Sequence, residues 1–412
     1  MSTPRLKQTA LSDTIQVGRQ AIFDSGLDVF AYELLYRDAG GRNSMTNGDT
    51  ASSVTLLNAF MEIGLDRIIG PNKAFINLTR HFFVDMPTIP FSPDRVVLEI
   101  LEDVMVDDAL LTGIAEMRAH GFELAMDDYA FQPGLAPLLP LVDYIKVEVR
   151  PDGLDRLERQ MPKLRATGAR LLAEKVETAE QFERLREMGF DYFQGFFFAR
   201  PKLIRSHRLH EHAAMLMRLL ARLNDPTIPI SEVVYLVSQD PGLSFKILRY
   251  INSAAVGMRN KVDSIQRAVV LMGLQRIRAW ASLFAMSGLE GRPMELLNMG
   301  IVRANLCEHF SRLCGRGDPE TAYTVGLLSI LDAMLARPID ELMQDLPLAD
   351  EIRQAIVSHA GLYGELLGLV IGIERNDWPG EDRCGLHPMQ TAEAYAASSE
   401  AAFSAIELLS AD

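Results

Sequence analysis

Short apolar runs rich in β-branched and aromatic residues recur along the first half of the chain. They predict strands over residues 29–35, 73–78, 95–100, 122–127, 143–148, 169–174 and 190–197. Amphipathic stretches over 107–119 and 178–188 separate some of these runs, and each ends at a glycine, as helices commonly do. Repeated alternation of strand and helix indicates βα units around a mostly parallel sheet, either closed as a barrel or open and doubly wound.

From about residue 206 the strand pattern disappears and helical periodicity takes its place. We predict helices over 207–223, 231–239, 243–252, 264–285, 294–313, 320–336, 348–358 and 362–375, with prolines near their ends. The pattern therefore divides the chain into an α/β domain over 1–205, an all-α domain over 206–385, and an Ala- and Ser-rich tail over 386–412 that we expect to be a loosely attached helix.

The composition is that of a globular protein with an acidic surface. The 412 residues are 48% hydrophobic and carry a formal charge of −14, divided equally between residues 1–205 (23 basic, 30 acidic) and 206–412 (18 basic, 25 acidic). This charge argues against a general affinity for nucleic acid or anionic membranes. Three cysteines without a metal or disulfide spacing, no signal-peptide pattern and no apolar run of about 18–20 residues predict a cytoplasmic protein that does not cross a membrane.

Polar residues stand at the carboxyl ends of the predicted strands: Glu33, Asn77, Glu99, Asp127, Asp128, Glu148 and Glu174. In a βα barrel these ends meet in one mouth, where so many carboxylates would repel one another without a cation. Oxygen ligands suit Mg²⁺, Mn²⁺ or Ca²⁺, and two such ions can clamp a phosphodiester. Lys146 shares a strand face with Glu148 and could hold a water or a phosphate. Each acid taken alone could instead be a helix cap or a salt-bridge partner.

Seven segments, in order, carry a family resemblance: RQAIFDSGLDVFAYELLYR, FINLT, LEILED, MDDYA, YIKVE, LLAEKVET and YFQGFFFARP. Together they resemble the EAL domain of bacterial cyclic di-GMP phosphodiesterases over nearly all of residues 15–205. The resemblance implies a modified TIM-like barrel that binds cyclic di-GMP. It further implies metal ligands at Glu33, Asn77, Glu99 and Asp127, a second-metal ligand at Asp128, a general base at Glu174, a water-holding Lys146, a phosphate contact at Arg37, and further substrate-binding positions at Leu35 and Gln194.

Three departures from the family pattern bear on catalysis. Glu148, a candidate metal ligand, stands where the family has the shorter aspartate. The glycine-rich loop after Asp128 is replaced by AFQPGLAPL, with Ala130 at a position where glycine would allow a positive φ and Pro133 stiffening the segment. Lys175 replaces the glycine beside the proposed base. We therefore expect ligand binding to be better preserved than turnover.

The helical half resembles an HDOD domain, a relative of the HD-type metal-dependent phosphohydrolases. The resemblance rests on DPGL at 240–243, NSA at 252–254 and AVVLMGL at 268–274. Catalytic HD domains carry a His-Asp pair in a Gly-Leu-Leu-His-Asp context, and residues 326–330 read Gly-Leu-Leu-Ser-Ile. Since Ser329 and Ile330 lack the imidazole and carboxylate of those ligands, we expect a domain that binds a protein partner without hydrolysing anything.

Three functions are compatible with this sequence. The leading hypothesis is an EAL–HDOD signalling protein that binds cyclic di-GMP with weak or no hydrolysis and signals to a protein partner through its HDOD domain. The second is an active phosphodiesterase that uses one or two Mg²⁺ or Mn²⁺ ions to form linear pGpG. The third is an interaction scaffold that has lost the nucleotide. A homodimer through the barrel is compatible with all three.

Overall fold

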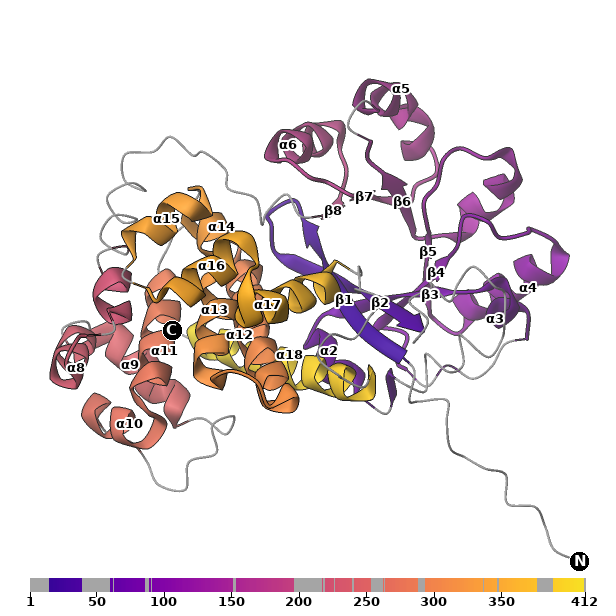
Figure 1. The fold of residues 1–412 in the computed structure, drawn as a ribbon. Helices are drawn as coiled ribbons and strands as arrows, with labels where there is room; N and C mark the ends of the chain where they lie inside the picture. Colours follow the sequence, from indigo (N-terminus) through magenta and orange to yellow (C-terminus); the bar gives the residue numbers. More distant parts are fainter. Residues whose placement is uncertain are drawn as a thin grey trace, which may run out of the picture. The chain divides into compact units, whose positions relative to one another are not determined.

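The computed structural model describes residues 15–38, 60–61, 63–85, 89, 91–150, 153–195, 217, 219–225, 227–238, 241–252, 262, 264–287, 293–335, 337–346, 348–375 and 388–410. The chain forms two compact units (Figure 1). One comprises Met1–Gly195 with Ile373–Ala396, and the other comprises Phe196–Gly372 with Ala397–Asp412. The predicted domain boundary at 205/206 lies outside the described residues.

The first unit is built on a closed eight-stranded barrel whose strands follow one another in chain order. The strands are β1 (Ile15–Asp24), β2 (Val29–Asp38), β3 (Lys73–Leu78), β4 (Val96–Ile100), β5 (Glu123–Met126), β6 (Tyr144–Glu148), β7 (Arg170–Glu174) and β8 (Tyr192–Gln194). β1 pairs antiparallel with β2 and β8, and all other neighbours are parallel. The structure therefore confirms the barrel in preference to the open sheet.

Helices accompany the strands and lie outside the barrel (Figure 1). They are α2 (Leu65–Ile69), α3 (Arg80–Asp85), α4 (Asp108–Ala119), the 3₁₀ helix η3 (Pro133–Leu141), α5 (Leu154–Arg165) and α6 (Ala179–Met188). Local sequence explains the ends of α6, because Thr178 and Gln181 form a capping box and Gly189 closes the helix at a φ of 90°. The predicted helices at 107–119 and 178–188 are confirmed as α4 and α6. The end of α4 differs slightly, since its C-cap is His120 and Gly121 follows it.

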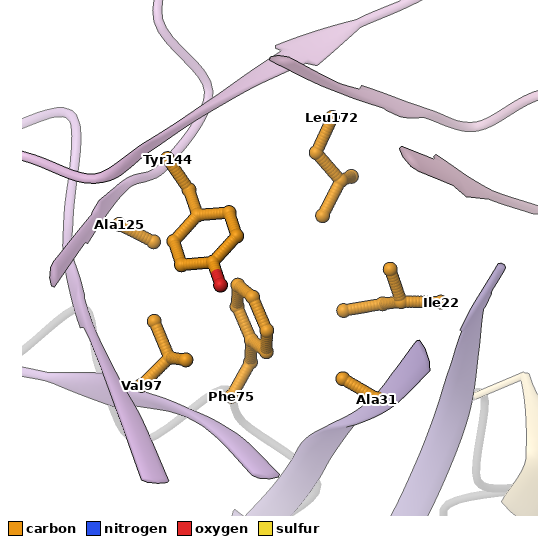
Figure 2. Close-up of a cluster of buried hydrophobic side chains, with 7 residues drawn as sticks. All are labelled: Ile22, Ala31, Phe75, Val97, Ala125, Tyr144 and Leu172. Atoms are coloured by element: carbon orange, nitrogen blue, oxygen red, sulfur yellow. The ribbon is translucent and has the colours of Figure 1, made fainter. Parts of the chain in front are cut away.

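An apolar layer fills the middle of the barrel (Figure 2). It is made of inward-facing, fully buried side chains, one from each of the strands β1 to β7: Ile22, Ala31, Phe75, Val97, Ala125, Tyr144 and Leu172. Tyr144 meets Phe75 edge to face, with ring centroids 5.2 Å apart. The barrel interior is therefore a packed core at this level, and the space for chemistry lies at its two ends.

Beneath this layer, at the end where the parallel strands begin, Glu123 joins two cations. Its carboxylate pairs with Lys73 and Arg170 and accepts a hydrogen bond of 3.2 Å from the Tyr144 hydroxyl. The Arg170 guanidinium also lies 4.0 Å from the centre of the Tyr144 ring. Burial alone would raise the pKa of Glu123, but the hydrogen bonds and charges of Lys73 and Arg170 outweigh it and hold the pKa below its usual range.

Glu123→Gln is expected to lower the free energy of unfolding by about 1–3 kcal/mol at pH 7. Because the folded-state pKa is depressed, the carboxylate stabilises the fold above its unfolded pKa and loses that effect as pH falls through the folded pKa. The difference between variant and parent should therefore shrink below about pH 4. Denaturant unfolding from pH 3 to 8 measures it, with the exposed Glu187→Gln as control. A difference independent of pH would contradict the assignment.

The second unit is helical. Its described helices are α8 (Ile230–Ser238), α9 (Pro241–Ile251), α10 (Ile265–Met272), α11 (Leu274–Ser287), α12 (Met294–Cys314), α13 (Pro319–Leu328), α14 (Leu331–Leu335), α15 (Ile339–Asp345) and α16 (Asp350–Ser358). The last two helices, α17 (Gly361–Glu374) and α18 (Pro388–Ser410), contribute residues to both units. The helix expected in the 386–412 tail is α18, and the helix predicted over 207–223 falls mostly outside the described residues.

Two predicted helices of this unit are each divided in the structure, and one helix was not predicted. The segment 264–285 breaks at Gly273, whose φ of 87° ends α10 before α11 begins. The segment 320–336 breaks between Leu328 and Leu331 into α13 and α14. The unpredicted helix is α15, which starts directly after Pro338. Each break is caused by the backbone conformation of one or a few residues. The spacing of apolar residues, from which the helices were predicted, does not reveal such a change.

One stretch of the described residues, Asp350–Glu374, is apolar enough to span a membrane by length and composition alone, with a mean hydropathy of 1.6 over its best window. It contains α16 and α17, which meet at His359 in a left-handed backbone conformation with a φ of 52°. Because buried helices of water-soluble proteins pass the same test, this stretch says little by itself about a membrane.

Candidate functional site

A polar layer lies directly above the apolar layer, at the mouth where the parallel strands end. Since side chains alternate along a strand, a residue two positions after an inward-facing apolar residue also faces inward. The pairs are Ala31 with Glu33, Phe75 with Asn77, Val97 with Glu99, Ala125 with Asp127, Tyr144 with Lys146, and Leu172 with Glu174. The structure thus brings together six of the residues that the sequence analysis selected.

Lys146 lies at the centre of this layer. Its Nζ is 2.8 Å from Glu99 Oε1, 2.8 Å from Asp127 Oδ1, 3.0 Å from Glu174 Oε1 and 3.5 Å from Glu33 Oε1. The side chains of Lys146 and Glu99 are both 0% exposed. One ammonium therefore faces four carboxylates from four other strands, in a place that bulk water does not reach.

A chain of hydrogen bonds extends the layer around the barrel. The Gln194 amide donates to Glu33 Oε2 at 2.6 Å and to Gln20 Oε1 at 3.0 Å, and the Asn77 amide donates to Glu33 Oε1 at 2.9 Å. These bonds fix both oxygens of Glu33. Gln20 was not predicted as a site residue. The signal that could have found it is its position two residues from the inward-facing Ile22 on β1.

The electrostatics of the layer favour an added cation. Burial raises the pKa values of Glu99 and Glu174 well above their usual range, and neighbouring carboxylates add to the effect. Burial opposes the charged form of Lys146, but the four surrounding carboxylates outweigh it and raise its pKa. The raised pKa values mean that Glu99 and Glu174 resist carrying their charges next to the other acids, and a bound divalent ion would stabilise the charged forms.

The donor atoms also fit a hard metal ion. Four buried acceptors of this layer have neither a hydrogen-bond partner nor an ion pair, namely Asn77 Oδ1, Glu99 Oε2, Glu174 Oε2 and Gln194 Oε1. Ligand oxygens of Asp127, Asp128 and Glu174 lie within 4.8 Å of one another. Carboxylate and amide oxygens are the ligands that Mg²⁺ and Mn²⁺ prefer, so the residues present fit such an ion.

The rim of the mouth shows how the sequence departures are accommodated. Positive φ values fall at Asp128 (40°) and Phe131 (62°), so the expectation that Ala130 holds the glycine-like position is wrong. Lys175 also has a positive φ of 56°, a conformation that favours glycine and costs other residues about 1–2 kcal/mol. Its ammonium lies 3.0 Å from Glu148 Oε2. Two of the departures therefore contact each other.

The remaining candidate residues are placed less completely. Leu35 is half-buried on β2, where it pairs with Gly18. Arg37 lies on the same strand and pairs with Gln16, but its side chain is outside the described part of the structure. Glu148 ends β6 beside Glu174 in the sheet register and turns its carboxylate to Lys175.

The backbones of β8 and of the segment after Glu174 approach each other closely, which holds Glu174 in place. Gly195 has a φ of 147°, and a Cβ there would lie 2.1 Å from the carbonyl oxygen of Val176. Only glycine lets β8 come this near to the segment that follows Glu174, where the Val176 amide donates to the Gln194 carbonyl at 2.9 Å. The two strands that present Glu174 and Gln194 are thus tied together.

In the second unit, the position of the expected His-Asp pair is filled by different chemistry. The Ser329 hydroxyl accepts a hydrogen bond of 3.1 Å from Arg303 and donates one of 2.8 Å to the Gly326 carbonyl. Ile330 is 1% exposed and packs close to Gly300. Neither side chain presents a metal ligand comparable to imidazole or carboxylate.

A closed barrel with a lysine-centred acidic mouth, followed by a helical domain, defines a two-domain EAL–HDOD protein. The HDOD domain family matches residues 209–346, and the EAL domain family matches residues 163–201. The uncharacterized protein YuxH of Bacillus subtilis (strain 168) is 35% identical over 376 residues, which are 88% of this chain and 91% of YuxH. The chain therefore belongs to the EAL–HDOD family.

A second relative and a solved structure are also similar to this chain. The cyclic di-GMP phosphodiesterase CdgJ of Vibrio cholerae serotype O1 (strain ATCC 39315 / El Tor Inaba N16961) is 31% identical over 384 residues, covering 90% of this chain and 88% of CdgJ. Among solved structures, the calcium and cyclic di-GMP complex of BlrP1 from Klebsiella pneumoniae is 22% identical with a TM-score of 0.39, covering 48% of this chain and 58% of BlrP1.

Proposed function

We propose that the mouth of the barrel binds cyclic di-GMP together with Mg²⁺ or Mn²⁺ and hydrolyses it slowly or not at all. The observation that carries this proposal is the convergence of four carboxylates on the buried Lys146, with four acceptor oxygens of the layer left unpaired. The kinship to CdgJ, which is named as a cyclic di-GMP phosphodiesterase, supports the same ligand.

Each residue of the mouth has a role in this proposal. Glu33, Asn77, Glu99, Asp127 and Asp128 hold the cation or cations, which when bound would polarise a phosphodiester and acidify a water. Glu174 Oε2 has no hydrogen-bond partner and can accept the proton of an attacking water. Lys146 holds Glu174 at 3.0 Å in the direction of the other acids. Gln194 keeps Glu33 oriented, and Arg37 and Leu35 contact the ligand.

We expect slow turnover because two features at the rim of the mouth would misplace a second ion. The Lys175 ammonium neutralises Glu148, which we take as a ligand position for a second ion, and the segment after Asp128 bends at Phe131 where the family has glycines. A displacement of one ion by an ångström is enough to misplace the attacking water, since reaction rates depend steeply on such distances. Binding of the ligand tolerates this change better than the chemical step does.

An active phosphodiesterase is the second candidate. It is favoured by the complete set of Glu33, Asn77, Glu99, Asp127, Lys146 and Glu174, because nothing in the central layer has been lost. If this candidate holds, linear pGpG forms at rates of roughly 1 s⁻¹ or more, which are ordinary for enzymes.

Calorimetric titration with cyclic di-GMP and chromatography of the products, each with Mg²⁺ and with Mn²⁺, separate these candidates. We expect metal-dependent binding with little or no pGpG. Rapid pGpG formation that Glu174→Gln abolishes would establish the enzyme instead. The absence of binding with either metal would exclude both candidates and leave an interaction scaffold that has lost the nucleotide.

The second unit completes the proposal. We propose that it passes the state of the barrel to a protein partner, since the HDOD match covers 209–346 and Ser329 and Ile330 offer no hydrolytic metal site. We further propose a cytoplasmic location, where cyclic di-GMP signalling would take place, and leave homodimerisation as part of the same proposal. Cross-linking in cells with and without cyclic di-GMP tests the partner.

A further inference from the structure

The pair formed by Lys175 and Glu148 stands at the edge of the acidic mouth. Lys175 Nζ lies 3.0 Å from Glu148 Oε2, with the lysine side chain 62% and the glutamate side chain 33% exposed. Glu148 lies opposite Glu174 in the register of β6 and β7, and Lys175 directly follows Glu174 in the chain. The ammonium is thus tethered next to the proposed base.

A group of metal-binding oxygens adjoins this pair. Asp127, Asp128 and Glu174 can each offer an oxygen within 4.8 Å of the others, and Glu174, 91% buried, keeps its Oε2 without a hydrogen-bond partner. The charge of Lys175 also acts on Asp128. A positive charge beside these oxygens opposes the arrival of a divalent ion and partly compensates the same carboxylates.

We propose that the Lys175 ammonium takes the place of a second divalent ion, so that the mouth holds one ion tightly and a second one weakly. This inference rests on the proposed function, because it presupposes a first ion bound around Glu33, Asn77, Glu99 and Asp127. The second ion would be held by two other acids of the mouth, Asp128 and Glu148. The longer Glu148 carboxylate reaches Lys175, so the two departures from the family pattern act as one device.

The backbone at Lys175 supports a functional role for its side chain. Lys175 has a φ of 56°, in the left-handed region that glycine adopts without cost. A residue with a Cβ is kept there despite a conformation that favours glycine, and strain of this kind at a site indicates a functional side chain. For the same reason Lys175→Gly should fold without difficulty, so the lysine can be removed cleanly.

A titration with Mn²⁺ alone, with free Mn²⁺ counted by electron paramagnetic resonance, tests this. The parent protein is expected to bind one ion tightly. Lys175→Met and Lys175→Gly are expected to bind a second ion at least about 10-fold more tightly than the parent does. Lys175→Arg keeps the charge and should resemble the parent, as should Lys163→Met, which removes an exposed lysine from α5.

The outcomes distinguish this inference from the proposed function. One tight ion in the parent with an unchanged second site in Lys175→Met would overturn the inference and leave the proposed function intact. Binding of no Mn²⁺ in any variant would remove the metal from the proposed function as well. Two equally tight ions in the parent would show that Lys175 does not exclude the second.

Discussion

Lys146→Met is expected to lower the free energy of unfolding of the metal-free barrel by about 3–5 kcal/mol, the usual cost of removing one partner from a buried ion pair. Lys146 is 0% exposed and is the only cation within 4.0 Å of Glu33, Glu99, Asp127 and Glu174 among the described ion pairs. Methionine has a similar volume, so the loss of charge dominates the effect. The four carboxylates are then left to repel one another.

The loss should depend on pH. Without Lys146, burial and the neighbouring acids hold the folded-state pKa values of Glu99 and Glu174 further above their unfolded values, because the attractive charge of the ammonium is gone. The folded protein then binds more protons than the unfolded protein between those values, so stability falls as pH rises through that window. Lys146→Met should be less stable at pH 8 than at pH 5, relative to the parent at each pH.

Added Mn²⁺ is expected to restore part of this stability, because it supplies the missing positive charge and binds only the folded mouth. Thermal unfolding with and without Mn²⁺ at about 1 mM measures the effect. Lys163→Met, a substitution at an exposed position, serves as the control. A melting temperature for Lys146→Met that equals the parent's without metal would show that the carboxylates do not depend on Lys146.

The central layer of the site could be predicted because of the strand period. Glu33, Asn77, Glu99 and Glu174 each end a short apolar run, and the closed barrel brings such ends together whatever lies between them. Their convergence on Lys146 required the three-dimensional structure. Strand ends fix which mouth a residue faces, but distances such as 2.8 Å depend on the stagger between strands, which the sequence pattern does not reveal.

The residues that were missed have specific physical reasons. β1 was not among the predicted strands because Gln16, Arg19 and Gln20 interrupt its apolar positions, and Gln20 was lost with it. Lys175 was noticed only as a replacement for glycine. Lys175 contacts Glu148 and has a positive φ, and neither an ion pair between strand ends nor a backbone angle has a counterpart in a pattern of apolar and polar residues.

The breaks in the helical unit have a similar origin, and the unit also contains a close crossing of two helices. α12 and α13 cross where small residues allow their backbones to meet. A Cβ on Gly326 would lie 2.4 Å from the carbonyl oxygen of Arg303, and a Cβ on Gly300 would lie 2.6 Å from the Ile330 side chain. The backbone of a helix cannot move aside as the end of a side chain can, so Gly326 is the less tolerant of the two positions.

Gly326→Val is therefore expected to destabilise the second unit by about 3 kcal/mol or more, the upper part of the range for overpacking a core. The matched control is Gly368→Ala on α17, because a Cβ there meets nothing within 4 Å. This control should be neutral or stabilising by up to about 1 kcal/mol, since alanine favours a helix more than glycine does. Both substitutions add a side chain to a glycine of the same helical unit, but the first is expected to lower its stability and the second to leave it unchanged or raise it.

Hydrogen exchange measured by mass spectrometry over peptides of α12 and α13, and separately over the barrel strands, checks this expectation. Gly326→Val should raise exchange in α12 and α13, and strands β3 to β7 should keep the protection of the parent. Because the chain forms two compact units, exchange also assigns the loss of stability to one of them, which the midpoint of a melting curve does not do by itself. Unchanged protection in α12 and α13 would mean that the helices separate at little cost, and that their crossing does not depend on the glycine.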